Sequence, residues 1–286
     1  MDYVKPADVV KTMIDASRFK LSLSPRDLLI RSALSGALLG TATSFAFTAA
    51  VTTGQPLVGA LIFPVSLVMI VILGLELITG SFALLPLAYL ERRSSMGSVM
   101  ANWAWVFLGN LLGSVAYGFL LAIVLTNFWH AEPTGVAARI VATAEAKTIA
   151  YQALGAAGMT VAFVKAMLCN WLVCLGVVMA MASTSTIGKL VGAWLPISVF
   201  FAQGFEHSVV NMFIIPTGML MGAKVTVSDW WLWNQIPVTL GNLVGGFTFT
   251  GLALYATYKP ATALQPNSNS KSNSMPDPMA AKVPAE

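Results

Sequence analysis

Six long runs of apolar residues, separated by charged or turn-forming residues, organise the chain. They cover about residues 28–51, 57–90, 99–128, 159–182, 190–220 and 233–258. Roughly 20 apolar residues are enough for a helix to cross a bilayer, so each run predicts a membrane span. The second and fifth runs are too long for one uninterrupted span and predict broken helices. The pattern favours an all-α integral membrane protein with six spans.

The segment before the first span predicts a different kind of helix. Pro6 suits a first helical turn, and apolar residues then recur at helical spacing opposite charged ones. These apolar residues are Val9, Val10, Met13 and Ile14. We expect this amphipathic helix to pack on neighbouring helices rather than lie on the membrane surface.

The composition divides the chain into three parts. Residues 1–26 form a cytoplasmic N-terminal amphipathic segment, and residues 27–258 form the six-span domain. Residues 259–286 are rich in Pro, Ser and Asn, which predicts a disordered cytoplasmic tail.

The balance of apolar and charged residues places the whole chain in a membrane. Hydrophobic residues make up 57% and charged residues 10% of the 286 positions, too few charges to cover a water-facing surface. This excludes a soluble enzyme and a disordered chain. The net charge of +4 comes from cations that flank the spans. The lipid bilayer is therefore an expected partner and nucleic acid is not.

The positions of the cations predict the orientation of the spans. Twelve of the 16 lysines and arginines lie at the N-terminus, in the loops after the second and fourth spans, and in the tail. Loops rich in Lys and Arg remain in the cytoplasm. We therefore expect a multi-pass protein of the cell inner or plasma membrane, with both termini cytoplasmic.

The two halves of the chain repeat one another. Gly-Leu-Glu at 74–76 recurs as Gly-Phe-Glu at 204–206, and Leu-Gly-Asn-Leu at 108–111 recurs at 240–243. A weaker match links the first and fourth spans, at 29–33 and 163–167. Because each half has three spans, the second half must be inverted relative to the first. Inverted repeats with Gly-interrupted helices around a midplane site are typical of transporters and channels.

Three ionisable residues fall at the predicted breaks: Glu76, Glu206 and His207. A charge at the bilayer centre costs about 2.5–3.5 kcal/mol on insertion scales, so such residues are functional candidates. The two glutamates occupy equivalent repeat positions, which favours a shared structural role. We expect them to accept hydrogen bonds from backbone N–H groups freed at the breaks. His207 has no such mate, because Leu77 occupies its repeat position.

The asymmetry of His207 favours a functional role. Histidine can donate a hydrogen bond to an anion or supply it with a proton. Thr79, in the opposite break, is the hydroxyl expected to face it. Asn170, within the fourth span, is a candidate to orient Glu206 or His207. The alternative is structural, because asparagine commonly forms hydrogen bonds between packed membrane helices.

Two lysines on the predicted external side, Lys147 and Lys165, are candidates for drawing anions toward the mouth of the protein. The alternative is structural, because a lysine near the end of a span commonly extends its amine to the membrane surface or helps to set topology.

Several of these motifs resemble those of the formate/nitrite transporter family, over about residues 6–258. The resemblance rests on GLELITG at 74–80, Asn102 with LGN at 108–110, LCNWLVC at 168–174, GFEHSVVNM at 204–212 and PVTLGN at 237–242. It implies an aquaporin-like fold and a homopentamer in which each protomer has its own pore. It also implies transport of small monovalent anions such as formate and nitrite.

The resemblance further assigns residues to the pore: two polar residues at its centre, four apolar residues at its constrictions and a lysine at its mouth. In that order they are Thr79 and His207; Phe63, Leu67, Val173 and Phe200; and Lys147. Extra residues separate Lys147 from the motif of the fourth span, so Lys165 is the alternative mouth lysine.

Together these features predict a channel or transporter for small monovalent anions, nitrite and/or formate, with proton-coupled or pH-gated passage past His207. An anion must shed water or take up a proton to cross an apolar constriction. The alternative is an aquaporin-like channel for small neutral solutes, which the lack of Asn-Pro-Ala motifs disfavours. A membrane metalloenzyme is disfavoured because a metal site needs several ligands and the chain has only two histidines. Neither a cofactor nor a metal is expected.

Overall fold

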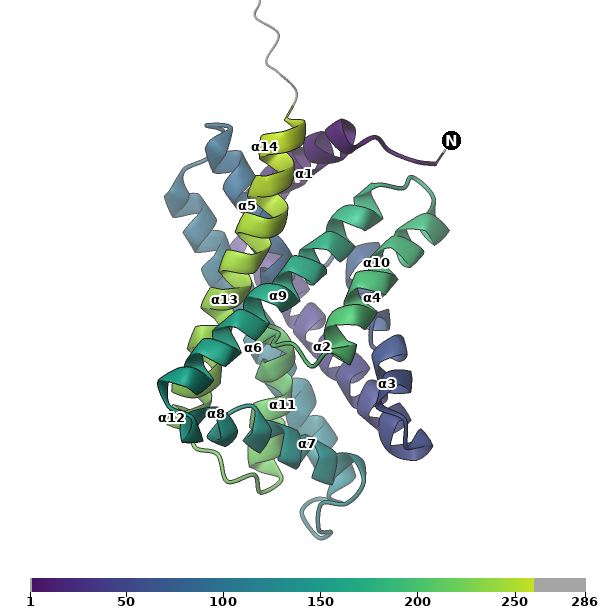
Figure 1. Cartoon of the computed structure of the whole chain (residues 1–286), viewed down its shortest axis with the longest axis vertical. Coiled ribbons are helices and arrows are strands. Elements are labelled where there is room, and N and C mark those ends of the chain that lie inside the picture. The colour runs from purple at the N-terminus through teal and green to yellow at the C-terminus, as the bar shows by residue number, and fades with distance from the viewer. Residues whose placement is uncertain (1, 260–286) are drawn as a thin grey trace, which may run out of the picture.

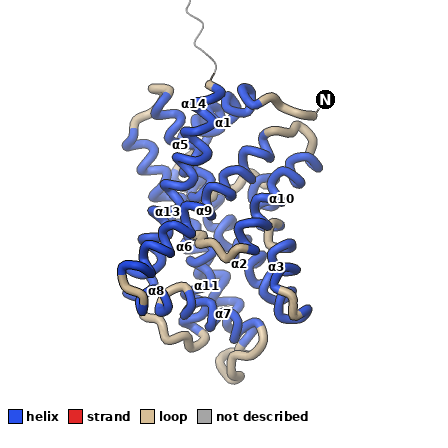
Figure 2. The backbone as a smooth tube through the Cα atoms, in the orientation of Figure 1, coloured by secondary structure: helices blue, strands red, loops and turns tan. Residues whose placement is uncertain are grey.

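The computed structural model describes residues 2–259, so the predicted disorder of the tail lies outside the described residues except at Lys259. Helices dominate the described part (Figures 1 and 2). In chain order they are α1 (Pro6–Ser22), α2 (Pro25–Thr53), α3 (Pro56–Ile62), α4 (Val65–Ile72), α5 (Ile78–Leu90), α6 (Met96–Leu125), α7 (Val136–Ala146), α8 (Ile149–Ala153), α9 (Ala156–Met181), α10 (Thr186–Ala202), α11 (Ser208–Leu220), α12 (Val227–Trp230), α13 (Ile236–Gly246) and α14 (Ala253–Tyr258).

Four helices are long and apolar enough to cross a membrane: α2, α6, α9 and the continuous helix Val227–Tyr258, which contains α12, α13 and α14. They match the predicted first, third, fourth and sixth spans. The sixth begins earlier than predicted because Thr226 and Asp229 form a capping box at its start. Two π-helical turns, Trp231–Gln235 and Phe247–Leu252, join its three parts.

The second and fifth spans are broken as predicted, between α4 and α5 and between α10 and α11. At each break a glycine adopts a left-handed conformation, Gly74 with φ 61° and Gly204 with φ 63°. The next amide closes the helix end, with Leu75 N–H donating to the Ile70 carbonyl at 2.9 Å and Phe205 N–H to the Phe200 carbonyl at 3.2 Å. Glycine is favoured at this point because other residues rarely adopt positive φ.

Matching close contacts confirm the internal repeat. Any side chain at Gly113 on α6 would collide with the backbone of α2 at Ala33, and any at Gly245 on α13 would collide with α9 at Met167. These residues are the ones that the sequence repeat pairs. The weak match between the first and fourth spans therefore reflects a shared helix contact, made close by small residues.

The segment between the predicted third and fourth spans, which no long apolar run covers, is largely helical. It contains α7 and α8. Ala137, Ile140 and Ala144 recur on one face of α7 and are buried, so packing against the bundle stabilises a short helix that the hydrophobic pattern did not single out.

The amphipathic N-terminal helix packs on the bundle, as expected. Val9, Val10 and Met13 of α1 are buried in one cluster with Leu84 and Leu87 of α5. Both α1 and α14 lie at one end of the molecule, and α7, α8 and α12 lie at the other (Figure 1). The two ends of the described chain therefore share one side of the bundle, here called the inner end.

Candidate functional site

The structure brings Thr79 and His207 together, as expected from their places in the two breaks. Thr79 lies in the first turn of α5, and His207 is the residue that caps the start of α11. Both are buried, and Thr79 Oγ1 lies 3.2 Å from His207 Nε2. The coil from α10 to α11 that carries His207 crosses the middle of the molecule (Figure 2).

The capping hydrogen bond of His207 assigns its neutral tautomer. The Val210 N–H donates to Nδ1 over 3.2 Å. Since a backbone amide is only a donor, Nδ1 carries no proton and the neutral ring carries its proton on Nε2. Nε2–H then donates to the Thr79 hydroxyl, whose own hydrogen can turn toward an incoming acceptor. The pair can therefore donate hydrogen bonds to an acceptor that reaches it.

Two asparagines satisfy the backbone at the breaks. The Nδ2 of Asn110 donates to the carbonyls of Glu76 and Ser32, and its Oδ1 accepts from Ile78 N–H. Asn242 repeats this arrangement with the carbonyls of Glu206 and Ala166 and with Ser208 N–H. The bonds of Asn110 to Glu76, Ser32 and Ile78 measure 3.0, 2.8 and 3.0 Å. Those of Asn242 to Glu206, Ala166 and Ser208 measure 2.9, 2.8 and 2.8 Å.

The expectation that the glutamates accept these backbone hydrogen bonds is therefore wrong. A carboxylate only accepts, whereas an amide side chain can satisfy a freed carbonyl and a freed N–H together. The sequence signal for this role is the Leu-Gly-Asn-Leu motif, which places an asparagine at the same position in each half.

Each glutamate instead pairs with a lysine from a helix that does not span the bundle. Glu76 Oε2 lies 2.7 Å from Lys20 Nζ on α1, and Glu206 Oε2 lies 2.8 Å from Lys147 Nζ, just after α7. The repeat extends to the lysine backbones: Asn102 and Asn234 each donate to the carbonyl of the corresponding lysine at 2.9 Å. Sequence reasoning missed Lys20, which no motif marked.

Glu206 has further partners that sequence reasoning also missed. The Tyr151 hydroxyl donates to its Oε1 at 2.7 Å, and Asn211 Nδ2 donates to its Oε2 at 2.8 Å. Burial, followed by the nearby Glu206 charge, raises the pKa of Tyr151 above its ordinary value, so the phenol remains a donor. Glu206 thus has the several partners that a buried carboxylate needs.

Asn170 acts on Thr79 rather than on Glu206 or His207. Its Nδ2 donates to the Thr79 carbonyl at 3.0 Å and to the Asn242 carbonyl at 2.7 Å. Cys174, one turn later on α9, donates to the same Thr79 carbonyl at 3.4 Å. The expected contact is therefore corrected: α9 holds the backbone of the residue that faces the histidine.

Replacing Asn170 by leucine should lower the free energy of unfolding by about 1–3 kcal/mol, because two buried carbonyls lose a donor while side-chain volume is nearly kept. Unfolding by sodium dodecyl sulfate in mixed micelles measures this. Thr52→Val is the matched control, because Thr52 is exposed and its hydroxyl only bonds its own helix at Thr48 and Ala49. Equal stability of the two variants would contradict the assignment.

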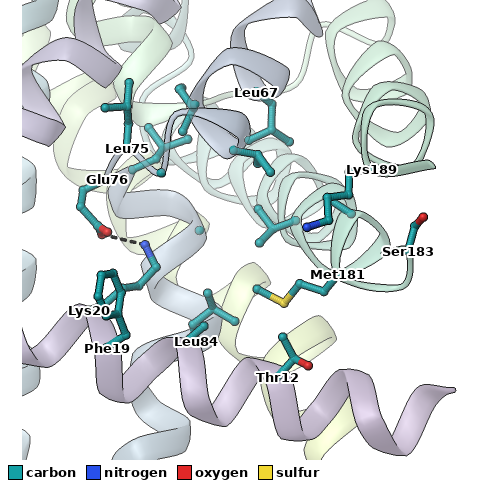
Figure 3. A pocket seen from close by; sticks show the side chains of 18 of the residues that line it. Thr12, Phe19, Lys20, Leu67, Leu75, Glu76, Leu84, Met181, Ser183 and Lys189 are labelled. Carbon is teal, nitrogen blue, oxygen red and sulfur yellow. Dashed lines mark hydrogen bonds and ion pairs between the residues drawn. The ribbon is translucent and has the colours of Figure 1, made fainter. Parts of the chain in front are cut away.

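Two cavities approach the Thr79–His207 pair from opposite ends. The inner cavity, of about 510 Å³, reaches from α1 to the first break and is lined by Lys20, Glu76 and Leu77 among others (Figure 3). The outer cavity, of about 450 Å³, is lined by Lys147, Phe200 and His207 among others. Among residues 2–259 no three His, Cys, Asp or Glu side chains gather as metal ligands would.

The four residues assigned to constrictions are buried in one apolar cluster: Phe63, Leu67, Val173 and Phe200. Leu67 lines the inner cavity and Phe200 the outer one. Phe63 packs edge-on against Phe200 with ring centres 5.7 Å apart, and Phe200 stacks on His207 at 5.8 Å. Apolar side chains therefore accompany the polar pair between the cavities.

Of the two candidate mouth lysines, one lines a cavity and the other packs against an aromatic ring. Lys147 lines the outer cavity, whereas Lys165 is absent from the described lining of that cavity. Lys165 is the tenth residue of α9, well inside the helix, and its amine lies 5.9 Å from the centre of the Tyr151 ring.

Comparisons with known proteins agree with this geometry. A sequence model of the formate/nitrite transporter family matches residues 7–256. A probable formate transporter of Methanothermobacter thermautotrophicus is 38% identical, with 90% of this chain and 97% of the relative covered. The formate channel FocA of Escherichia coli (strain K12) is 28% identical, with coverages of 90% and 95%.

Solved structures share the fold. An FNT family ion channel superposes with a TM-score of 0.75 at 30% identity, covering 88% of this chain and 99% of that one. A pentameric formate channel with formate bound gives a TM-score of 0.65 at 27% identity, with coverages of 82% and 97%.

Proposed function

Because the chain belongs to the formate/nitrite transporter family, and is accordingly a membrane transport protein rather than an enzyme, we propose that it conducts formate and nitrite past Thr79 and His207. The observation that carries the proposal is the buried Thr79–His207 pair between two cavities at opposite ends. A small monovalent anion could accept the hydrogen bonds that this pair donates, and it is small enough to pass between the apolar side chains around the pair.

The proposed passage is proton-coupled. An anion that enters either cavity loses water as it approaches the buried apolar residues, which is costly for a charge and much cheaper for a neutral acid. Nε2–H of His207 and the Thr79 hydroxyl replace part of the lost hydration. The proton that neutralises the anion comes from the cavity side, since Nδ1 of His207 is occupied by the Val210 amide.

Assembly, topology and domain division are parts of the same proposal. The pentameric formate channel similar to this chain supports a homopentamer, and α6 has outward apolar side chains, including Leu112 and Leu120, available to lipid or a neighbouring copy. The cation pattern supports cytoplasmic termini in an inner or plasma membrane, with residues 1–26 and 259–286 flanking a transport domain at 27–258.

A flux panel with purified protein in liposomes tests the proposal. Formate, nitrite, lactate, bicarbonate and hydrosulfide are offered at several pH values, and glycerol and water permeation are followed by vesicle swelling. We expect saturable formate and nitrite flux that rises as pH falls, because a larger fraction of substrate then carries a proton. Glycerol entry no faster than in empty liposomes is expected as well.

Two results would count against the proposal. Rapid glycerol and water permeation without anion flux would support the aquaporin-like alternative. Anion flux that does not change with pH would leave an anion channel but remove the proton coupling.

A further inference from the structure

The lysine nearest each helix break has its charge cancelled at short range. Lys20 in the wall of the inner cavity pairs with Glu76, and Lys147 in the wall of the outer cavity pairs with Glu206. All four side chains are largely buried, from 2% to 16% exposed. Each pair therefore presents a dipole rather than a net charge to an ion that enters its cavity.

One other cation lines each cavity, and neither forms an ion pair within residues 2–259. In the inner cavity it is Lys189 on α10, whose amine points into the pocket from the side opposite the Lys20–Glu76 pair (Figure 3). In the outer cavity it is Arg139, two turns before Lys147 along α7, with its guanidinium 5.9 Å from the centre of the Phe47 ring.

The two cavities therefore carry the same net charge. The titratable residues that line the inner cavity are Lys20, Glu76 and Lys189. Those that line the outer cavity are Arg139, Lys147 and His207, and Glu206 lies directly behind Lys147. With a neutral His207, each cavity carries one uncompensated positive charge, on Lys189 or on Arg139.

We propose that Lys189 and Arg139, rather than the paired lysines, supply the charge that concentrates anions in the two cavities. A single charge in a cleft with low-dielectric walls raises the local concentration of counter-ions and the rate at which they enter. The inference rests on the proposed function, because it concerns how an anionic substrate reaches Thr79 and His207.

The test uses Arg139→Gln and Lys189→Gln in right-side-out and inside-out membrane vesicles, which expose opposite cavities to added formate. Each variant should raise the half-saturating formate concentration about fivefold from the side of its own cavity, with little change in maximal flux. The shift should vanish near 1 M of an impermeant salt, where screening acts within about 3 Å.

Matched variants separate charge from other effects. Arg139→Lys and Lys189→Arg keep the charge and should retain the parent half-saturation. Lys224→Gln at the outer end and Lys11→Gln at the inner end remove exposed cations that are not among the residues lining either cavity, and they should behave like the parent.

The outcomes distinguish this inference from the proposed function. If the parent carries formate but both glutamine variants match Lys224→Gln and Lys11→Gln, the inference is overturned and the function stands. If the parent carries no monovalent anion, the function itself fails. If each variant acts from the opposite vesicle preparation, the inference holds and the predicted topology is reversed.

Discussion

Replacing His207 by phenylalanine should lower formate and nitrite flux about 10- to 150-fold, the value of one hydrogen bond to a charged group. The phenylalanine ring can keep the stack on Phe200, where the ring centres lie 5.8 Å apart. It cannot cap Val210 N–H or donate toward Thr79, so a transferring anion has no replacement for its lost water. Initial rates with protein in liposomes measure the effect, and unchanged nitrite flux would show that the central-histidine role is wrong.

His207→Asn separates hydrogen-bond donation from proton supply. Asparagine is a favoured residue at the start of a helix, so its side-chain oxygen can accept from Val210 N–H. Its amide N–H can donate toward Thr79 in place of Nε2–H, but it does not titrate. We therefore expect substantial flux in His207→Asn. Flux as low as in His207→Phe, in a variant that folds and assembles normally, would instead support proton supply by the imidazole.

The second large effect is expected at the buried ion pair of the outer cavity. Glu206→Gln should lower the free energy of unfolding by about 3–5 kcal/mol, because Lys147 then remains charged and buried without its counter-charge. The double variant Lys147→Met with Glu206→Gln should recover much of this loss, since it removes the stranded charge. Unfolding by sodium dodecyl sulfate in mixed micelles, applied to all variants as a double-mutant cycle, measures the coupling.

The chain offers an internal comparison for this experiment. Glu91 pairs with Lys259 at 2.8 Å, but those side chains are 17% and 38% exposed. Glu91→Gln should therefore cost about 0–1 kcal/mol, as is usual for ion pairs in contact with water. A loss for Glu206→Gln no larger than for Glu91→Gln would mean that water already compensates the Lys147 charge.

The flux and stability experiments address different parts of one arrangement. In the proposed function Thr79 and His207 meet the substrate, whereas Asn110, Asn242 and the two lysine–glutamate pairs hold the broken helices in place. A variant of His207 should therefore change flux far more than stability, and a variant of Glu206 should change both. Equal losses of stability in variants of the Thr79–His207 pair and of the ion pairs would mean that any substitution at the helix breaks destabilises the fold.

The hydrophobic pattern determined the helical class, the span count and the two broken helices, because bilayer thickness imposes a length on every apolar run. The repeat determined that the breaks correspond and that His207 alone departs from it. The left-handed backbone position at each break is visible in the sequence as a glycine, Gly74 or Gly204. Such features are local or periodic, and so the sequence is enough to find them.

Only the tertiary structure decided which side chains satisfy which groups. Asn242 bonds residues 36 and 76 positions away, Lys20 meets Glu76 across 56 positions, and Asn170 reaches Thr79 across 91. No spacing rule relates residues so far apart, because their separation in space depends on how the helices cross. For the same reason, the sequence marked Lys147 as a cation near the mouth, and only the fold revealed that Glu206 cancels its charge while Arg139 and Lys189 keep theirs.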